Sequence, residues 1–464
     1  MSWPRATARQ IAHAVRRGDA TAATVVAEHI AEGEARAAIS GAFTAARGRS
    51  ALAEAKTVDE LPDLASLSLA GVPVAVCERF SVAGQHTRHG SNAAVLPVAS
   101  RDHEVVRRLR GAGAVVIGST RSSELGLWAS TDDGQGPLAN PWRADRGVAG
   151  PSGGAAVVVA DGTVPLAVGS DGPGTAGGVR TTAAACGLIG VSAEHDPAEY
   201  RENTAGWLSG AAGVLATTVG DAAEAHAVLT RTRPSVISEP HRLRIAATDR
   251  PPIGGVGQMR GPINPDAETV ESLLEVVRTL TDLGHDTRRF APNLGTRASG
   301  ASFTAWAAAA GQRAARFERA RLQRRTRRLA AVGDRTLRGG LSVLFGDGAR
   351  TRAHVVEWFT DHGIDVLVTP ALAAPAAPGE NWSRMGLREN LRASARAAAF
   401  TAVWGLIGLP ALVLPVGTRA DGLPSTIQLI APPGGGAVLF DLASQLVDVC
   451  KPRRYPPAVI ADGA

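Results

Sequence analysis

Short apolar segments alternate with helical patterns between Gly71 and Gly190, and this alternation constrains the fold most strongly. The predicted elements of this region are, in chain order, strand 72–76, helix 102–112, strand 114–117, helix 153–160 and strand 164–168. The strands are short apolar runs, and the first of them follows the turn Ala70–Gly71. Since strands that alternate with helices build layered sheets, the sequence predicts an α/β fold.

The alternation continues towards the C-terminus, and residues 5–32 at the other end are predicted to be helical. The later predicted elements are strand 244–247, helix 268–283, strand 366–369, strands 412–415 and 426–430, and helix 437–449. No internal repeat or low-complexity linker divides the 464 residues, so we expect one domain. Its expected parts are an N-terminal helical region (1–50), a central core (68–230), a variable insert (285–400) and closing strands with a helix (400–460).

Composition excludes several classes of protein. The formal net charge is +6, but no recognition motif accompanies it, so we expect no nucleic-acid partner. The arginine-rich stretch from Arg313 to Arg328 has helical spacing and predicts a solvated helix face. Three cysteines form neither a disulfide framework nor a zinc motif, so we expect no metal and no cofactor. The apolar runs are too short to span a membrane and the N-terminus lacks an apolar signal core, so a cytoplasmic protein is expected.

Four blocks of sequence carry a family resemblance. They are GVPVAVCERFSVAGQHTRHGS (71–91), GAVVIGSTRSSELG (113–126), GPLANPW (136–142) and the glycine-rich stretch that runs to Asp171. Together with residues 400–430 they resemble the amidase signature family. The resemblance implies a layered α/β/α fold around a large mixed sheet. It also implies amide hydrolysis by a serine nucleophile, a bridging serine in a cis peptide and a lysine base.

The residues at the positions of that catalytic triad are different here. Cys77 occupies the lysine position, and Lys56 and Lys451 are the only lysines in the chain. The family's Gly-Gly-Ser-Ser-Gly-Gly stretch aligns with residues 149–154, so Pro151 replaces the bridging serine and Ser152 keeps the second one. Ser152 precedes a predicted helix, where capping is the alternative role. Proline lowers the cost of a cis bond, so Gly150–Pro151 is predicted to be cis.

Cys77 allows two interpretations. A thiolate would be a nucleophile if a cationic neighbour lowered its pKa, and Arg79, His86 and His89 are close in sequence. The alternative is a buried, inert cysteine that acts as a small apolar side chain.

The loop that should hold the family's nucleophile contains three extra residues. Counting forward from Asp171 puts Thr175 at the nucleophile position, whereas counting backward from Arg180 puts Gly178 there. The insertion is expected to disturb the oxyanion donors, because these must lie about 3 Å from the developing charge. Thr175 without an adjacent base is a weak nucleophile, and the alternative is a turn residue.

These substitutions predict a repurposed enzyme that acts on an amide- or acyl-containing small molecule by non-hydrolytic chemistry, such as cyclisation, elimination or acyl handling in secondary metabolism. Two alternatives stay open: a non-catalytic binding or partner subunit, and a residual hydrolase that uses Thr175 or Cys77. We expect a small-molecule partner and no membrane partner, and we consider a homodimer. The candidate catalytic residues are Cys77, Ser152 and Thr175, and the candidate substrate-binding residues are Arg79, His86, His89, Pro151, Gly174, Gly177 and Gly178.

Overall fold

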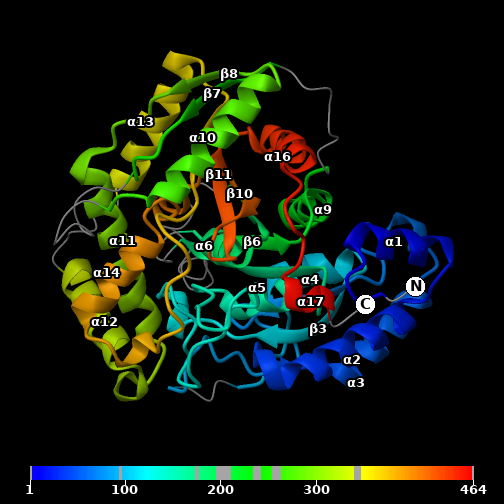
Figure 1. Ribbon diagram of the computed structural model, residues 1–464. Helices are drawn as coiled ribbons and strands as arrows, with labels where there is room; N and C mark the ends of the chain where they lie inside the picture. Colours follow the sequence, from blue (N-terminus) through cyan, green and yellow to red (C-terminus); the bar gives the residue numbers. More distant parts are fainter. Residues whose placement is uncertain are drawn as a thin grey trace.

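One mixed sheet forms the centre of the protein (Figure 1). The computed structural model describes residues 3–93, 97–172, 177–194, 211–233, 242–252, 263–338 and 346–461. Within these ranges the sheet has 11 strands in the order β1-β3-β2-β4-β6-β5-β10-β11-β9-β7-β8. Their bounds are β1 Phe43–Ala46, β2 Pro73–Cys77, β3 Val115–Thr120, β4 Leu166–Asp171, β5 Ile189–Ser192, β6 Ala211–Ala216, β7 Arg244–Ala247, β8 Asp286–Arg289, β9 Val366–Pro370, β10 Ala411–Thr418 and β11 Pro424–Ile430. Strands pair in both directions, which confirms the predicted α/β class with a large mixed sheet.

Helices fill most of the connections between the strands. Their bounds are α1 Ala8–Arg17, α2 Ala22–Ser40, α3 Gly48–Asp59, α4 Glu104–Gly111, α5 Gly153–Ala160, α6 Gly178–Cys186, α9 Val219–Thr230, α10 Ala267–Asp282, α11 Gly295–Ala314, α12 Arg324–Arg338, α13 Gly346–His362, α14 Leu387–Ala397, α15 Ala402–Ile407, α16 Gly436–Cys450 and α17 Pro457–Ala461, with short 3₁₀ turns η1 Leu64–Ser66, η2 Glu124–Gly126, η3 Arg319–Arg321 and η5 Trp382–Arg384. All five elements predicted between residues 71 and 190 are present. The strand predicted at 164–168 begins at Leu166 and continues to Asp171.

Both faces of the sheet are covered by helices, which gives the three layers. Successive side chains of a strand point to opposite faces. In β9, Val366 and Val368 join the core cluster that also contains residues of α10 and α16. Leu367, between them, joins a second cluster with residues of α11, α13 and α15. The sheet therefore separates two apolar layers, as the layered α/β/α architecture requires.

The N-terminal helical region consists of two helices rather than one. Gly18 ends α1 with a positive φ of 74°, and the hydroxyl of Thr21 accepts a hydrogen bond from Thr24 N to start α2. The two ends of the chain lie on the same side of the molecule, next to α1 (Figure 1). Arg5 Nη1 donates to the carbonyl of Val459 in α17 at 3.2 Å. The N-terminal region is thus fastened to the closing helix.

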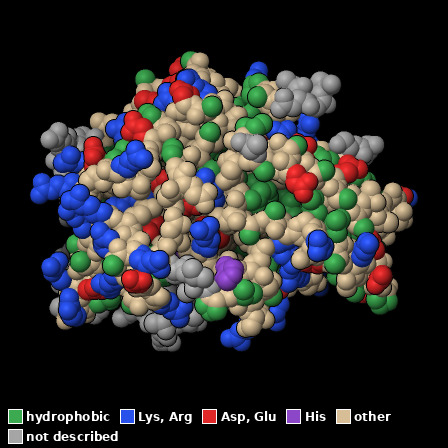
Figure 2. Space-filling model, turned by 90° about the horizontal axis from the view of Figure 1, so that it is seen from below, with side chains coloured by type: hydrophobic (Ala, Val, Ile, Leu, Met, Phe, Trp, Pro, Cys, Tyr) green, Lys and Arg blue, Asp and Glu red, His purple; other side chains and the backbone are tan. Residues whose placement is uncertain are grey.

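The predicted variable insert at 285–400 contributes β8 and β9 to the shared sheet, so these residues are continuous with the central core. None of the described helices is long and apolar enough to cross a bilayer. On the face shown in Figure 2, the arginine and lysine side chains are scattered and acidic side chains lie between them.

Candidate active site

Cys77 is the last residue of β2 and is completely buried, with 0% of its surface exposed. The thiol accepts a contact from the hydroxyl of Ser152 at 3.8 Å. Burial raises the pKa of the Cys77 thiol, and the nearby positive charge of Arg79 offsets only part of that effect. A buried thiol with a raised pKa is protonated near pH 7, so this geometry favours the inert cysteine over the thiolate nucleophile.

Ser152 is brought to Cys77 by the loop before α5, as the family resemblance implies. Its hydroxyl donates towards Cys77 and accepts from the backbone N–H of Ser170 in β4 at 3.0 Å. Ser152 precedes α5, but its side chain makes no capping hydrogen bond, so the capping role is wrong. The hydroxyl instead ties the ends of β2 and β4 together.

The Gly150–Pro151 bond is cis, which confirms the prediction from the aligned loop. Gly150 lies where no side chain would fit, because a Cβ would come within 2.5 Å of the carbonyl oxygen of Trp128. The carbonyl of Pro151 accepts from Ser123 N at 3.0 Å. Pro151 has neither a hydroxyl nor an N–H, so it offers nothing to a proton relay.

The far side of the site is the end of β4 and the start of α6. Asp171 and Arg180 form an ion pair of 3.0 Å with both side chains 0% exposed. Gly178 packs against Asp171. A Cβ at Gly178 would lie 2.4 Å from the carboxyl carbon of Asp171, so no side chain fits there. At Gly177 a Cβ would meet the hydroxyls of Thr181 and Thr401 at 2.0 and 2.2 Å. Close packing therefore explains both glycines without a ligand.

Two candidate residues of this loop, Gly174 and Thr175, lie outside the described residues. The choice between Thr175 and Gly178 for the nucleophile position therefore remains a prediction. Gly178 itself has no side chain and cannot supply a hydroxyl.

The three candidate cationic residues do not meet at Cys77. Arg79 is 2% exposed and its guanidinium packs against Gly126, where a Cβ would be 2.5 Å from Nη1. Burial and the charges of Arg79 and two further arginines lower the pKa of His89 to about 3, so its ring is neutral near pH 7. His89 packs edge-on against Phe317 at 5.9 Å between ring centroids. His86 lies on the surface, in a bridge with Val98.

A cavity of about 380 Å³ lies against the loop that carries Pro151. Its lining comes from residues 129–131, 137–138, 146–149 and 185, and from 372–378, 380, 382, 393 and 396–397. Thr131 joins the wall to the loop, because its hydroxyl accepts from Gly153 N and donates to the carbonyl of Ala149, both at 3.0 Å. We call this space the first cavity. Its volume falls in the range of small-molecule sites.

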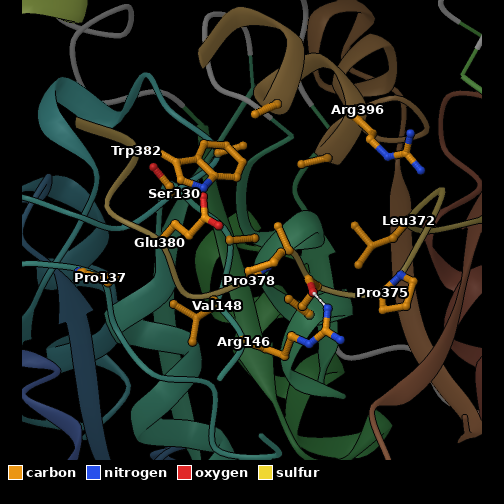
Figure 3. Close-up of a pocket in the computed structure, with 18 of the residues that line it drawn as sticks. Ser130, Pro137, Arg146, Val148, Leu372, Pro375, Pro378, Glu380, Trp382 and Arg396 are labelled. Atoms are coloured by element: carbon orange, nitrogen blue, oxygen red, sulfur yellow. Dashed lines mark hydrogen bonds between the residues drawn. The ribbon is translucent and has the colours of Figure 1, made fainter. Parts of the chain in front are cut away.

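The first cavity has an apolar wall with a few polar groups (Figure 3). Trp382, Ser130 and Glu380 lie together on one side, and Arg396 lies across from them beside Leu372. The Ser130 hydroxyl donates to Asp132 at 3.1 Å and accepts from Arg325 at 3.3 Å, so its orientation is fixed from behind. These groups could orient a small polar substrate.

The first cavity does not bring the described candidate residues together. Its described lining includes none of Cys77, Ser152, His86 and His89. Cys77 and Ser152 are instead buried in the core, at the ends of β2 and β4. The sequence missed Ser130, Thr131, Glu380 and Arg396, since nothing in their local patterns marks them as neighbours.

The arginine-rich stretch is not a solvated helix face throughout. It spans the end of α11, η3 and the start of α12, and Arg313 and Arg325 within it are 1% exposed. Arg313 donates to the carbonyl of Leu125 at 3.1 Å, and Arg325 pairs with the carboxylate of Asp132. Both therefore hold the segment 125–132 in place, whereas Arg321, Arg324, Arg327 and Arg328 are exposed.

Among the described residues, no group of three His, Cys, Asp or Glu could hold a metal ion.

We expect Cys77 in the native protein to react with iodoacetamide at least about tenfold more slowly than Cys450, because its thiol is buried and protonated. Cys450 at the end of α16 is only half-buried. Peptide mass spectrometry at timed intervals measures both rates. In guanidinium all three cysteines should react alike, which controls for intrinsic differences. Labelling of Cys77 before Cys450 in the native protein would contradict the inert thiol.

Comparison with known proteins gives one consistent result. A family model described as Amidase matches residues 25–439. The chain is 32% identical over 407 residues to the candidate amidase AmiB2 of Mycobacterium bovis, covering 85% of this chain and 86% of that protein. It is also 32% identical over 431 residues to the candidate amidase AmiA2 of Mycobacterium tuberculosis, covering 87% and 85%. The solved structure of 6-aminohexanoate cyclic dimer hydrolase superimposes with a TM-score of 0.84 at 22% identity over 99% of each chain, which is a similarity of fold.

Proposed function

Because the chain belongs to the amidase family, we propose that it binds an amide- or acyl-containing small molecule in the first cavity and acts on it without serine–lysine hydrolysis. The chemistry would be cyclisation, elimination or acyl handling. The observation that carries the proposal is the pair of side chains, Cys77 and Ser152, near the positions of the family's catalytic triad. The Cys77 thiol and the Ser152 hydroxyl face each other at 3.8 Å in the core, and the first cavity lies against the loop that carries Pro151.

The relay residues argue against ordinary hydrolysis. A lysine base accepts protons from the bridging serine in the family pattern, whereas a thiol with a raised pKa accepts none near pH 7. The cis Pro151 fills the bridging position without a hydroxyl. A serine or threonine attacks an amide only when a base removes its proton. The proposal therefore keeps the binding function and replaces the reaction.

The described lining of the first cavity contains groups that could handle a proton or orient an amide. Glu380 is exposed to the solvent and its carboxylate lies beside Trp382 and Ser130 (Figure 3). The Ser130 hydroxyl is held by Asp132 and Arg325. In this proposal, the Arg396 guanidinium donates to the amide or acyl oxygen, and Glu380 exchanges the proton.

We expect no turnover of simple aryl amides or esters above that of the Thr175→Ala variant, and no labelling by a fluorophosphonate probe. Loss of a general base alone lowers rates by roughly 10²–10⁴-fold, and here a second relay group is absent too. Chromogenic anilides and nitrophenyl esters measure this directly. Turnover that Thr175→Ala abolishes would establish a surviving hydrolase and defeat the non-hydrolytic reading.

A further inference from the structure

A second cavity, of about 920 Å³, lies at the carboxyl ends of three parallel strands, β7, β8 and β9. Its lining consists of residues 247–252, residues 289–295, Leu367, Thr369 and Trp404. None of these residues belongs to the described lining of the first cavity. The second cavity is therefore a separate space.

The topology places this cavity where α/β proteins bind ligands. The chain leaves β7 for α10, whose Leu273 and Leu280 pack in one core layer. It leaves the neighbouring β8 for α11, whose Ala305 and Ala309 pack in the other. Adjacent parallel strands whose connections leave to opposite faces open a crevice at their carboxyl ends, and such crevices are the usual ligand sites of open sheets.

Trp404 gives an independent indication of a ligand. It is 1% exposed, and its indole N–H has no acceptor among the described residues. Three other tryptophans satisfy theirs. Trp128 donates to Thr326, Trp142 to the carbonyl of Cys186 and Trp306 to that of Leu127, at 2.9, 2.8 and 2.8 Å. Buried donors are normally paired, so an acceptor brought by a ligand would complete the site.

The charges and apolar groups of the lining define the ligand further. Arg289 pairs with Asp249 at 3.3 Å, whereas the exposed side chain of Arg250 makes no hydrogen bond or ion pair in the described part of the chain. The exposed side of the second cavity, which we call its mouth, thus carries one positive charge without an acidic partner among the described residues, that of Arg250. The apolar side chains of Phe290, Leu367 and the nearby prolines form the rest of the wall.

We propose that the second cavity binds a small carboxylic acid that has an apolar body and a neutral carbonyl group. The carbonyl accepts from the Trp404 N–H at the buried end. The carboxylate stays at the mouth with Arg250, because burying a charge costs far more than burying a neutral carbonyl. This site goes beyond the proposed function and does not depend on it.

Calorimetry with 4-oxo-4-phenylbutanoate tests the proposal, since this probe has the ring, the ketone and the carboxylate. Trp404→Phe keeps the ring and removes the donor, and it should raise Kd about three- to tenfold, the value of one hydrogen bond. The same variant should leave 4-phenylbutanoate, which lacks the ketone, unaffected. Arg250→Gln should raise Kd about two- to fivefold for the acid but not for its carboxamide. Trp382→Phe, in the first cavity, is the matched control and should change nothing.

A measurement on the unmodified protein guards against a variant that fails to fold. The indole N–H resonance that is missing in Trp404→Phe should shift downfield when the ketone probe is added. Binding weaker than about 1 mM would overturn the proposal. So would a Kd that responds to Trp382→Phe rather than Trp404→Phe, since the probe would then occupy the first cavity.

Discussion

Replacing Arg325 with methionine is expected to lower the free energy of unfolding by about 3–5 kcal/mol. Arg325 and Asp132 form an ion pair in which neither side chain is exposed. The guanidinium also donates to Asn390 at 2.7 Å and to Gln323 at 2.8 Å, and it lies 4.9 Å above the ring of Trp128. Removing the cation leaves the Asp132 carboxylate buried without a counter-charge, which costs far more than the loss of an exposed pair.

This pair also joins distant parts of the chain. Asp132 belongs to the segment that lines the first cavity, Arg325 to α12, and Asn390 to α14. The second oxygen of Asp132 accepts from Ser383 N in η5 at 2.8 Å. Helices α12 and α14 and the turn η5 are therefore held onto the segment around Asp132 by one buried network, and its loss should affect the first cavity as well.

Denaturation in guanidinium measures the effect, with Arg328→Met as the matched control. Arg328 is on the same helix but exposed, so its replacement should change stability by no more than about 0.5 kcal/mol. The double variant Arg325→Met with Asp132→Asn should lose less free energy of unfolding than Arg325→Met alone, because it has no buried carboxylate without a counter-charge. A cost below about 1 kcal/mol for Arg325→Met would show that the pair does not stabilise this interface.

Glu78→Gln is expected to become more stable relative to the wild type as the pH rises from about 4.5 to about 8. Glu78 follows Cys77 and is 2% exposed, and only one of its carboxylate oxygens has a partner among the described residues, Ser122 N at 3.2 Å. Burial, and secondly the negative charge of Asp133, raise the pKa of Glu78 to about 8. The folded protein therefore keeps a proton that the unfolded chain releases.

The sign follows from proton linkage. Between the unfolded and folded pKa values the native state binds more protons, so its stability falls as the pH rises. The slope is at most about 1.4 kcal/mol per pH unit, or roughly 4–5 kcal/mol over the whole window. Glutamine cannot ionise, so the Glu78→Gln variant does not lose stability in this way as the pH rises.

Thermal or guanidinium unfolding of both proteins from pH 4.5 to 8 measures the difference. Glu104→Gln is the control with the opposite shift, because hydrogen bonds from Arg108 and Arg107 lower the pKa of Glu104 to about 2. The difference in the free energy of unfolding between Glu104→Gln and the wild type should stay constant over this pH range. A constant difference for Glu78→Gln as well would mean that Glu78 is ionised in the folded protein.

The alternation of strands and helices was predictable from the sequence because it depends on residues close together in the chain. Val72–Val76 is an apolar run beside a turn, and both this strand and the helix predicted at 102–112 are present in the structure. The break at Gly18 and the 3₁₀ turns were missed, because a single capping residue outweighs a weak apolar stripe. The sequence also singled out Cys77 and Ser152 as candidate site residues, and the structure brings these two side chains next to each other.

The cavities and the buried charges were decided by the tertiary structure alone. The wall of the first cavity joins 129–149 to 372–397, and the indole N–H of Trp404 is unusual only because no acceptor among the described residues packs against it. Arg325 and Arg328 lie three residues apart in the same arginine-rich stretch, yet one is buried and the other is exposed. Local patterns determine which segments are strands and helices. Which polar side chains are enclosed depends on contacts between segments far apart in the chain, and no short stretch of sequence contains that information.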